Sequence, residues 1–237
     1  MSTTYVSGSP TRTDAPPRDL RGFWRILLAV VAPVPGVALA LSNGFNPSEL
    51  GGSTRETFDA FAAHQVQGSL SIWFAAIFAV LAVPSGVAMM MATRRVAPRL
   101  STFVVGFVTF GFCAGVTAPS VANLIALVTA QHHLDVATGI KIADELFTSP
   151  VGNAAILPFF LTITLGRLLL GIVLWRARIA PRWMAVAMLL ASPVEFIVPF
   201  GNVGPTLAYG LTAIGFASAS VALLRMRNDE FDLPPVA

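Results

Sequence analysis

Charged residues are scarce in this sequence of 237 residues. Asp, Glu, Lys and Arg together make up 11% of the chain, whereas an average soluble domain carries about 25%. Hydrophobic residues make up 55%, and the mean hydropathy is +0.73. So few charges cannot cover the surface of a soluble protein of this size. The composition excludes a soluble globular enzyme and predicts an integral membrane protein.

Cysteine and lysine are almost absent. Cys113 is the single thiol, which excludes an intramolecular disulfide and a cysteine metal cluster. Its apolar neighbours predict a buried, inert thiol. Lys141, the single lysine, lies outside the apolar segments, so a retinal Schiff base is excluded. Histidine is also missing from these segments, and no nucleotide-binding, GxSxG or HExxH motif occurs in a usable context, so we expect no cofactor.

Six apolar segments are long enough to cross a membrane, which takes about 20 residues of helix. They are Phe23–Ser42, Ser69–Met91, Ser101–Ala130, Ala154–Trp175, Trp183–Phe200 and Pro205–Leu224. The predicted fold class is all-α, a polytopic bundle of six transmembrane helices. The predicted domains are a disordered cytoplasmic tail (1–21), the six-helix domain (22–226) and a second cytoplasmic tail (227–237).

Basic residues occupy alternate connections of this predicted bundle. Twelve of the fifteen lie before or at the very start of span one, between spans two and three, between four and five, or after six. The opposite side holds Arg55 and Lys141 beside six carboxylates. Because cytoplasmic loops retain Arg and Lys, we expect both termini in the cytoplasm and the protein in the cell membrane.

Three local patterns predict how the helices begin and pack. Ser53 and Glu56 have capping-box spacing, which predicts a helix that begins outside the membrane and runs straight into span two. Span three is long enough to tilt or project, and Pro119 is expected to kink it. Gly111 and Gly115 form a GxxxG, for which we favour packing within the chain over a dimer interface.

Arg167 and Glu195 are charged residues that each lie deep inside an apolar span. Such groups cost several kcal/mol unless they are paired or face a polar cavity. Counted from Arg176 and Arg182, they lie about 14 and 20 Å above the same membrane edge, on spans that must be antiparallel neighbours. We predict an ion pair or a water-bridged contact. It would be either a structural clamp or the charged floor of a ligand or proton pathway.

Prolines flank Glu195 and predict a broken helix. A broken helix in a membrane is tolerated where protein or water satisfies the freed backbone groups. We therefore expect residues 192–202 to be irregular and to line a cavity open to the outside. The polar residues expected near it are Asn123, Asn153, Asn202, Thr206 and Tyr209.

A second polar cluster is expected on the outer side. It contains His64, His132 and His133 with the outer carboxylates, including Asp144 and Glu145. Imidazole and carboxylate suit divalent metals, but no spacing puts two ligands on one helical face, so we favour solvated residues and predict no metal site. Glu195, Asp144 or Glu145 beside Phe58, Phe61, Trp73, Phe147, Phe159, Phe196 and Phe200 would instead give a carboxylic acid at an apolar pocket.

One segment carries a family resemblance. Leu174-Trp175-Arg176 ends span four, and Pro181-Arg182-Trp183 begins span five. The stretch Leu168–Trp183 resembles a recurring feature of small, uncharacterised six-helix membrane proteins of high-GC actinobacteria. The charge pattern and the long loop before span two fit that group as well. The resemblance implies the topology and implies no activity.

Two main functions stay open. The favoured one is binding or transport of a small apolar or amphipathic molecule, with Arg167, Glu195, Asn123, Asn202, Tyr209 and His64 as ligand-binding residues. The alternative is an enzyme acting on a lipid-like or isoprenoid substrate through carboxylate acid catalysis, a cyclase or isomerase. A structural partner of another membrane protein is a third. Expected partners are membrane lipids, a small ligand and a second copy or another membrane protein, but no nucleic acid.

Overall fold

The computed structural model describes residues 19–49, 51–115, 119–198 and 201–231. Within these ranges the chain is helical apart from short connections and forms no strand, which confirms the all-α prediction there. The helices are α1 (Arg21–Val31), α2 (Val34–Phe45), α3 (Thr54–Ala63), α4 (Gln65–Thr93), α5 (Pro98–Gly115), α6 (Pro119–Gln131), α7 (Val136–Thr148), α8 (Pro150–Leu161), the π-helix η1 (Thr162–Gly166), α9 (Arg167–Ala177), α10 (Arg182–Ile197), α11 (Val203–Arg225) and α12 (Asn228–Phe231).

In the described part of the chain, five helical stretches are long and apolar enough to cross a membrane. They are Arg21–Phe45, Gln65–Thr93, Pro98–Gln131, Pro150–Ala177 and Val203–Arg225, and they contain expected spans one to four and six. Expected span five corresponds to α10, whose 16 helical residues are fewer than the about 20 of a typical membrane-crossing helix. Six spans therefore stay a prediction. The two predicted tails lie mostly outside the described residues.

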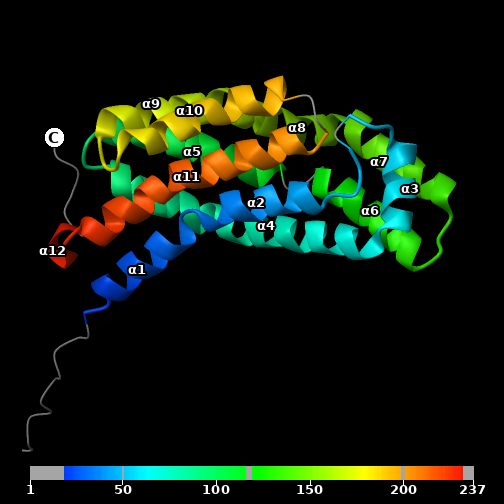
Figure 1. Ribbon diagram of the computed structural model, residues 1–237, viewed down its shortest axis with the longest axis horizontal. Helices are drawn as coiled ribbons and strands as arrows, with labels where there is room; N and C mark the ends of the chain where they lie inside the picture. Colours follow the sequence, from blue (N-terminus) through cyan, green and yellow to red (C-terminus); the bar gives the residue numbers. More distant parts are fainter. Residues whose placement is uncertain (1–18, 50, 116–118, 199–200, 232–237) are drawn as a thin grey trace, which may run out of the picture.

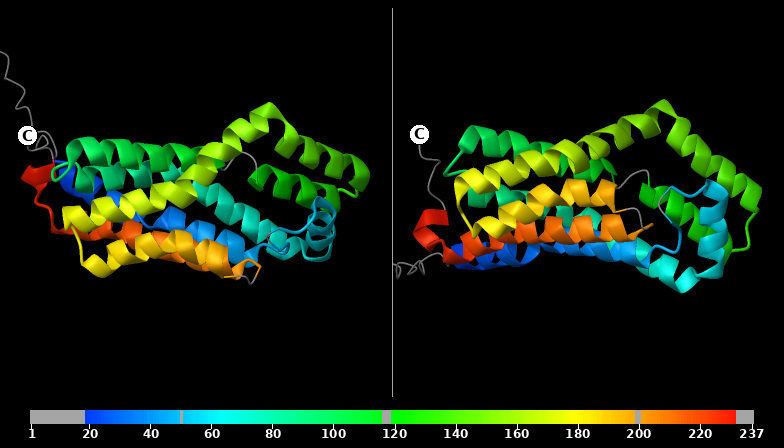
Figure 2. Two further views of the ribbon diagram at one scale, coloured as in Figure 1. Left: turned by 90° about the horizontal axis from the view of Figure 1, so that it is seen from above. Right: turned by 45° about the horizontal axis from the view of Figure 1, so that its top comes forward.

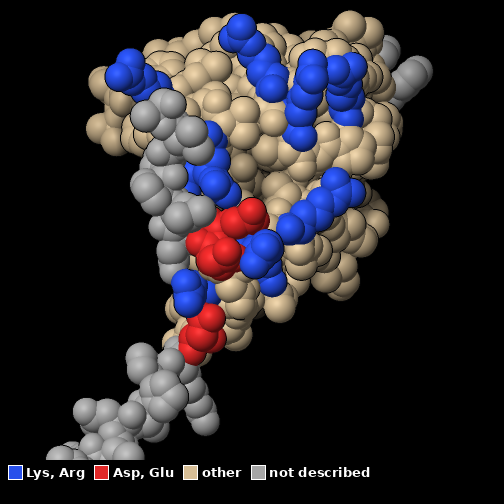
Figure 3. Space-filling view, turned by 90° about the vertical axis from the view of Figure 1, so that its left-hand side faces the viewer, with Lys and Arg blue, Asp and Glu red and all other residues tan. Residues whose placement is uncertain are grey.

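The two ends of the bundle differ in composition. The start of α1, the end of α11 and the α4–α5 and α9–α10 connections meet at one end (Figure 1). This end carries many Arg side chains (Figure 3) and is called the Arg-rich end below. Arg94 donates from Nη2 to the Phe231 carbonyl at 2.7 Å, which holds α12 against the α4–α5 connection.

At the opposite end, α3, α6 and α7 form a helical cap on the bundle (Figure 2). Phe58 and Phe61 of α3 pack with Ala126 and Leu127 of α6 and Ala143 of α7 in a separate hydrophobic cluster. α5 has 18 residues and α6 has 13, together about 46 Å of helix, against a hydrocarbon thickness of about 30 Å. The expected excess length of span three is confirmed, and its outer part forms one wall of the cap.

The start of α3 agrees with the sequence, whereas its end does not. Ser53 caps α3 as predicted: its hydroxyl accepts from the Glu56 amide, and the Glu56 carboxylate accepts from the Ser53 amide. The prediction that this helix runs straight into span two is wrong. His64 has φ −128° and ψ 52°, outside the helical region, and α4 begins afresh at Gln65. The break lets α3 lie across the end of the bundle (Figure 1).

The first membrane helix is broken at Pro33, and the neighbouring helices satisfy the backbone there. Proline has no N–H, so the Ala29 carbonyl loses its helical donor. Ser220 of α11 replaces it, donating from Oγ to Ala29 O at 2.6 Å. Ser85 of α4 likewise donates to Ala32 O at 2.5 Å. These bonds permit a break at membrane depth, where unsatisfied carbonyls would be costly.

Small residues let the helices approach one another closely. A Cβ on Gly111 would lie 2.7 Å from the Pro158 carbonyl oxygen, and one on Gly115 would collide with the Phe159 ring. The GxxxG therefore faces α8 of the same chain, which confirms intrachain packing over a dimer contact. Gly171 and Gly215 face α10 in the same way, while Gly210 faces open space.

Replacing the serine that repairs the α1–α2 break tests this account. Ser220→Ala should lower the free energy of unfolding by about 0.5–1.5 kcal/mol, because Ala29 O is then left without a donor. Equilibrium unfolding in detergent micelles would measure the loss. Ser218→Ala is the control, since its hydroxyl is buried without a partner among the described residues. Equal losses in the two variants would refute the account.

Candidate functional site

A buried ion pair joins α9 to α10. Arg167 donates from Nη1 to Oε2 of Glu195, so the predicted pair is present. The Arg167 side chain is 0% exposed and that of Glu195 is 8% exposed. The guanidinium carbon of Arg167 also lies 4.4 Å from the centre of the Tyr209 ring on α11. The pair and the ring bring together three helices that meet in the bundle interior.

The π-helix η1 sets the direction of Arg167. A π-turn holds one residue more than an α-turn, so it rotates the residues that follow by about 100°. Arg167, the first residue after η1, donates its amide to Thr162 O. Ser192 of α10 donates from Oγ to the carbonyls of Ile163 at 2.6 Å and Thr164 at 3.0 Å. These bonds satisfy backbone carbonyls of the widened turn and hold α10 beside η1.

Sequence reasoning missed η1. The weak signal is the segment Thr-Ile-Thr-Leu-Gly (162–166), which has two threonines and a glycine and follows Pro158 within an apolar span. Such residues are poor helix formers and tolerate a widened turn. Because no residue type is specific to a π-turn, the pattern alone does not reveal it.

The helix that carries Glu195 is more regular than expected. The prediction of an irregular segment from residue 192 is wrong, because α10 continues through Pro193 to Ile197. Val198 then turns to an extended conformation, and Gly201 adopts a left-handed one with φ +48°. α11 begins at Val203, so Pro205 lies in the first helical turn, where a missing N–H costs nothing. Residues 199 and 200 lie outside the described residues.

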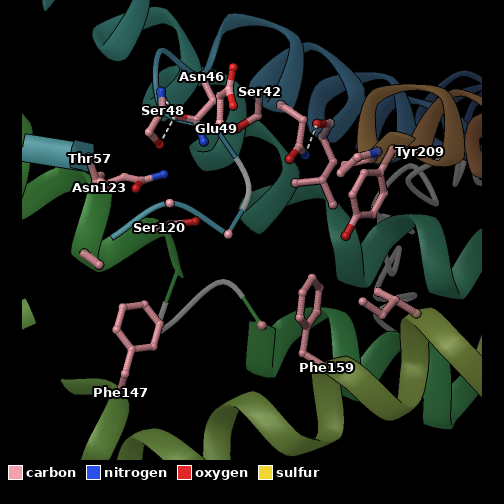
Figure 4. A pocket seen from close by; sticks show the side chains of 18 of the residues that line it. Ser42, Asn46, Ser48, Glu49, Thr57, Ser120, Asn123, Phe147, Phe159 and Tyr209 are labelled. Atoms are coloured by element: carbon pink, nitrogen blue, oxygen red, sulfur yellow. Dashed lines mark hydrogen bonds between the residues drawn. The ribbon is translucent and has the colours of Figure 1, made fainter. Parts of the chain in front are cut away.

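A cavity of about 360 Å³ opens between the ion pair and the helical cap. That volume is within the range of about 300–1,000 Å³ typical of small-molecule sites. In Figure 4, Phe147 and Phe159 lie on one side of the space, and Ser42, Asn46, Ser48 and Tyr209 on the other. Glu195 and Tyr209 contribute to its floor, and Thr57 of α3 and Asn123 of α6 belong to the cap. The cavity thus has an aromatic wall and a polar wall.

The structure brings together some of the predicted ligand-binding residues. Glu195, Asn123 and Tyr209 line the cavity, and Arg167 lies behind Glu195. Asn202 does not line it. Asn202 instead donates from Nδ2 to the carbonyls of Asn46 at 3.0 Å and Ser48 at 2.7 Å, which anchors the loop at the cavity rim.

Other predicted residues lie elsewhere. His64 borders a separate shallow surface at the α3–α4 break, and among the described residues no three His, Cys, Asp or Glu side chains are placed to hold a metal. Asp144 accepts from Thr54 Oγ1 at 2.5 Å, which ties α7 to α3, and Glu145 is exposed on α7. Asn153 donates from Nδ2 to the Thr148 carbonyl, and Thr206 donates from Oγ1 to the Asn202 carbonyl, so both bond to backbone close to them in sequence.

Of the expected aromatic residues, four line the cavity: Phe58, Phe147, Phe159 and Phe196. Phe61 is fully buried under Gly68, and Trp73 is 68% exposed on the outside of α4. Phe200 lies outside the described residues.

The polar rim at the end of α2 was missed. Ser42, Asn43, Asn46 and Ser48 line the cavity, together with Glu49. The available signal is the run Ser-Asn-Gly-Phe-Asn-Pro-Ser-Glu, which follows an apolar span directly. The same run is typical of an ordinary solvated loop, so the sequence alone does not show that it lines a cavity. That depends on which helices pack around it.

The comparisons with known proteins identify a family. Residues 26–225 match a family described as Domain of unknown function (DUF4386). The chain belongs to the DUF4386 family. The match spans all the long helices of this DUF4386 protein and the whole site. No curated protein and no solved structure matches the chain.

The turn that carries the sequence resemblance lies inside the DUF4386 match. Arg182 places its guanidinium carbon 5.2 Å from the centre of the Trp175 ring, across the α9–α10 connection. Arg178 ends α9 in a left-handed conformation with φ 51°. The motif thus closes a tight turn by a cation–π contact at the Arg-rich end. It fixes the antiparallel pairing that brings Arg167 to Glu195.

A double-mutant cycle tests the energetic coupling of the pair. Arg167→Met and Glu195→Gln should each lower the free energy of unfolding by about 3–5 kcal/mol, because each leaves a buried charge without its partner. The double variant should lose about 2 kcal/mol less than the sum of the two. Chemical unfolding in micelles measures all three variants.

The exposed pair Arg55–Asp59, at 3.2 Å on α3, provides the control cycle. Exposed pairs of this kind couple by about 0.5 kcal/mol or less. Additive losses at Arg167 and Glu195, as small in coupling as the control, would show that the pair does not hold α9 to α10.

Proposed function

We propose that this DUF4386 protein crosses the cell membrane six times, with both termini in the cytoplasm. α10 packs between α9 and α11 and supports the sixth crossing, since it runs alongside two membrane-length helices. Its 16 residues span about 24 Å, which a locally thinned bilayer accommodates. The Arg-rich end (Figure 3) supports the orientation, because Arg is retained in the cytoplasm. The helical cap then faces outward.

We further propose that the protein binds, and in transport would carry, a small apolar or amphipathic molecule in the cavity under the cap. The observation that carries this proposal is the cavity itself, with an aromatic wall, a polar wall and an ion pair at its base. An amphipathic molecule satisfies both walls at once. Phe196 is 59% exposed at the cavity edge, which supports entry from the lipid side of the cap.

The arrangement favours binding over acid catalysis. An acid catalyst must present its carboxyl group to the substrate, whereas Oε2 of Glu195 is taken up by the contact with Arg167. Asp144 does not line the cavity and accepts a hydrogen bond from Thr54. Glu145 also lies outside the cavity lining. An enzyme acting on a lipid-like substrate would need one of these groups protonated at the substrate.

Native mass spectrometry of the protein, incubated with a lipid extract and gently solubilised, tests the binding function. We expect a small-molecule mass increment that is lost in Asn123→Phe, because the added ring fills the cavity from α6. Gln131→Phe, on the exposed end of the same helix, is the matched control and should keep the increment.

Fragmentation of the released molecule separates the two functions. A molecule identical to one in the extract supports binding, and a converted product supports the enzyme. An increment unchanged in Asn123→Phe, or no increment in the wild type, would overturn the proposed site.

A further inference from the structure

We propose that the cavity selects a lipophilic organic cation, an amine or quaternary ammonium compound with an apolar body. This inference rests on the proposed binding function and names the class of ligand. It is carried by two independent properties of the described cavity lining, its charge and its aromatic content.

The charged side chains that line the cavity are carboxylates. Glu49 and Glu195 line it, and no Lys, Arg or His is among the described lining residues. Arg167 faces Glu195 from behind, so the carboxylate that the lining offers to a ligand is that of Glu49. A charge interacts more strongly in a cavity bounded by protein and lipid than in water. The field therefore attracts cations and repels anions.

Aromatic rings are concentrated in the lining. Seven described lining residues are aromatic: Phe58, Phe78, Phe147, Phe159, Phe160, Phe196 and Tyr209. With 25 lining residues this exceeds the 10% aromatic content of the whole chain by more than twofold. Ring faces carry negative electrostatic potential, and several rings around one site recognise quaternary ammonium groups. The aromatic wall binds the apolar body of a cation and stabilises its charge.

The structure already contains one cation bound in this manner. The guanidinium of Arg167 has a carboxylate on one side and the Tyr209 ring at 4.4 Å. A ligand ammonium in the cavity would meet the Glu49 carboxylate and the lining rings in a comparable way. Arg167 is 0% exposed, so its own donors do not reach a ligand. Its Nε and Nη2 have no hydrogen-bond partner in the described part of the chain, which makes an anionic ligand the competing possibility to test.

Three probes of matched shape separate these possibilities: 4-butyl-N,N,N-trimethylanilinium, its neutral isostere 1-butyl-4-tert-butylbenzene, and the anion 4-butylbenzenesulfonate. Equilibrium binding to the full-length protein in nanodiscs is measured for each, and Asn123→Phe corrects for partition into lipid. We expect the cation to bind about tenfold more tightly than the neutral isostere. The anion should show no binding above the filled variant.

Glu49→Gln provides a variant that leaves the buried pair intact. Glu49 is exposed at the rim, so its replacement should leave the fold intact. Because the replacement removes a negative charge from the lining, the affinity for the cation should fall several-fold and the affinity for the neutral isostere should not change. Glu145→Gln, an exposed carboxylate outside the lining, is the matched control and should change neither affinity.

The outcomes distinguish this inference from the function beneath it. Equal or tighter binding of the neutral isostere would overturn cation selection and leave the binding function standing. Preferred binding of the sulfonate would also overturn it and point to Arg167 as the anchor. Binding of all three probes indistinguishable from that of Asn123→Phe would overturn both.

Discussion

The architecture depends on two opposite charges that are buried inside the helix bundle. Arg167 and Glu195 lie in apolar helices, and each would be strongly unfavourable alone. Their pairing requires α9 and α10 to be antiparallel, adjacent and in one register. The tight turn closed by Trp175 and Arg182 supplies the pairing, and η1 supplies the direction of Arg167. Tyr209 then brings α11 against the pair.

The same burial governs the backbone. At two places where a helix is broken or widened inside the bundle, a serine of another helix donates to the backbone carbonyls there. Ser220 and Ser85 do so at the α1–α2 break, and Ser192 does so at η1. Each of these bonds joins two helices, so the repair of one helix also fixes the position of another. The same hydrogen bonds thus satisfy the irregular backbone and hold the helices together.

The helical cap encloses a cavity at one end of the bundle. The break at His64 lays α3 across the end of the bundle, and the long third span supplies α6 as the opposite wall. Asn202 ties the α2–α3 loop to the start of α11. A cavity results because the cap spans the bundle end without filling it. Its base is the ion pair, so the element that fixes the fold also gives the cavity its polar floor.

Composition and periodicity alone determined the membrane class, the positions of the long apolar helices and the Arg167–Glu195 pair. They suffice because these properties follow from local rules: apolar length, turn chemistry and the cost of a lone buried charge. Capping of α3 by Ser53 was predictable for the same reason.

Only the tertiary structure decided which residues form the cavity. Asn46 and Asn202 meet across 156 positions of sequence, and whether Phe58 or Phe61 faces the cavity depends on how α3 turns at His64. Asp144, an equal candidate to Glu195 by residue type, instead ties α7 to α3. Such choices follow from the placement of whole helices, because a cavity is defined by surfaces that many distant segments share.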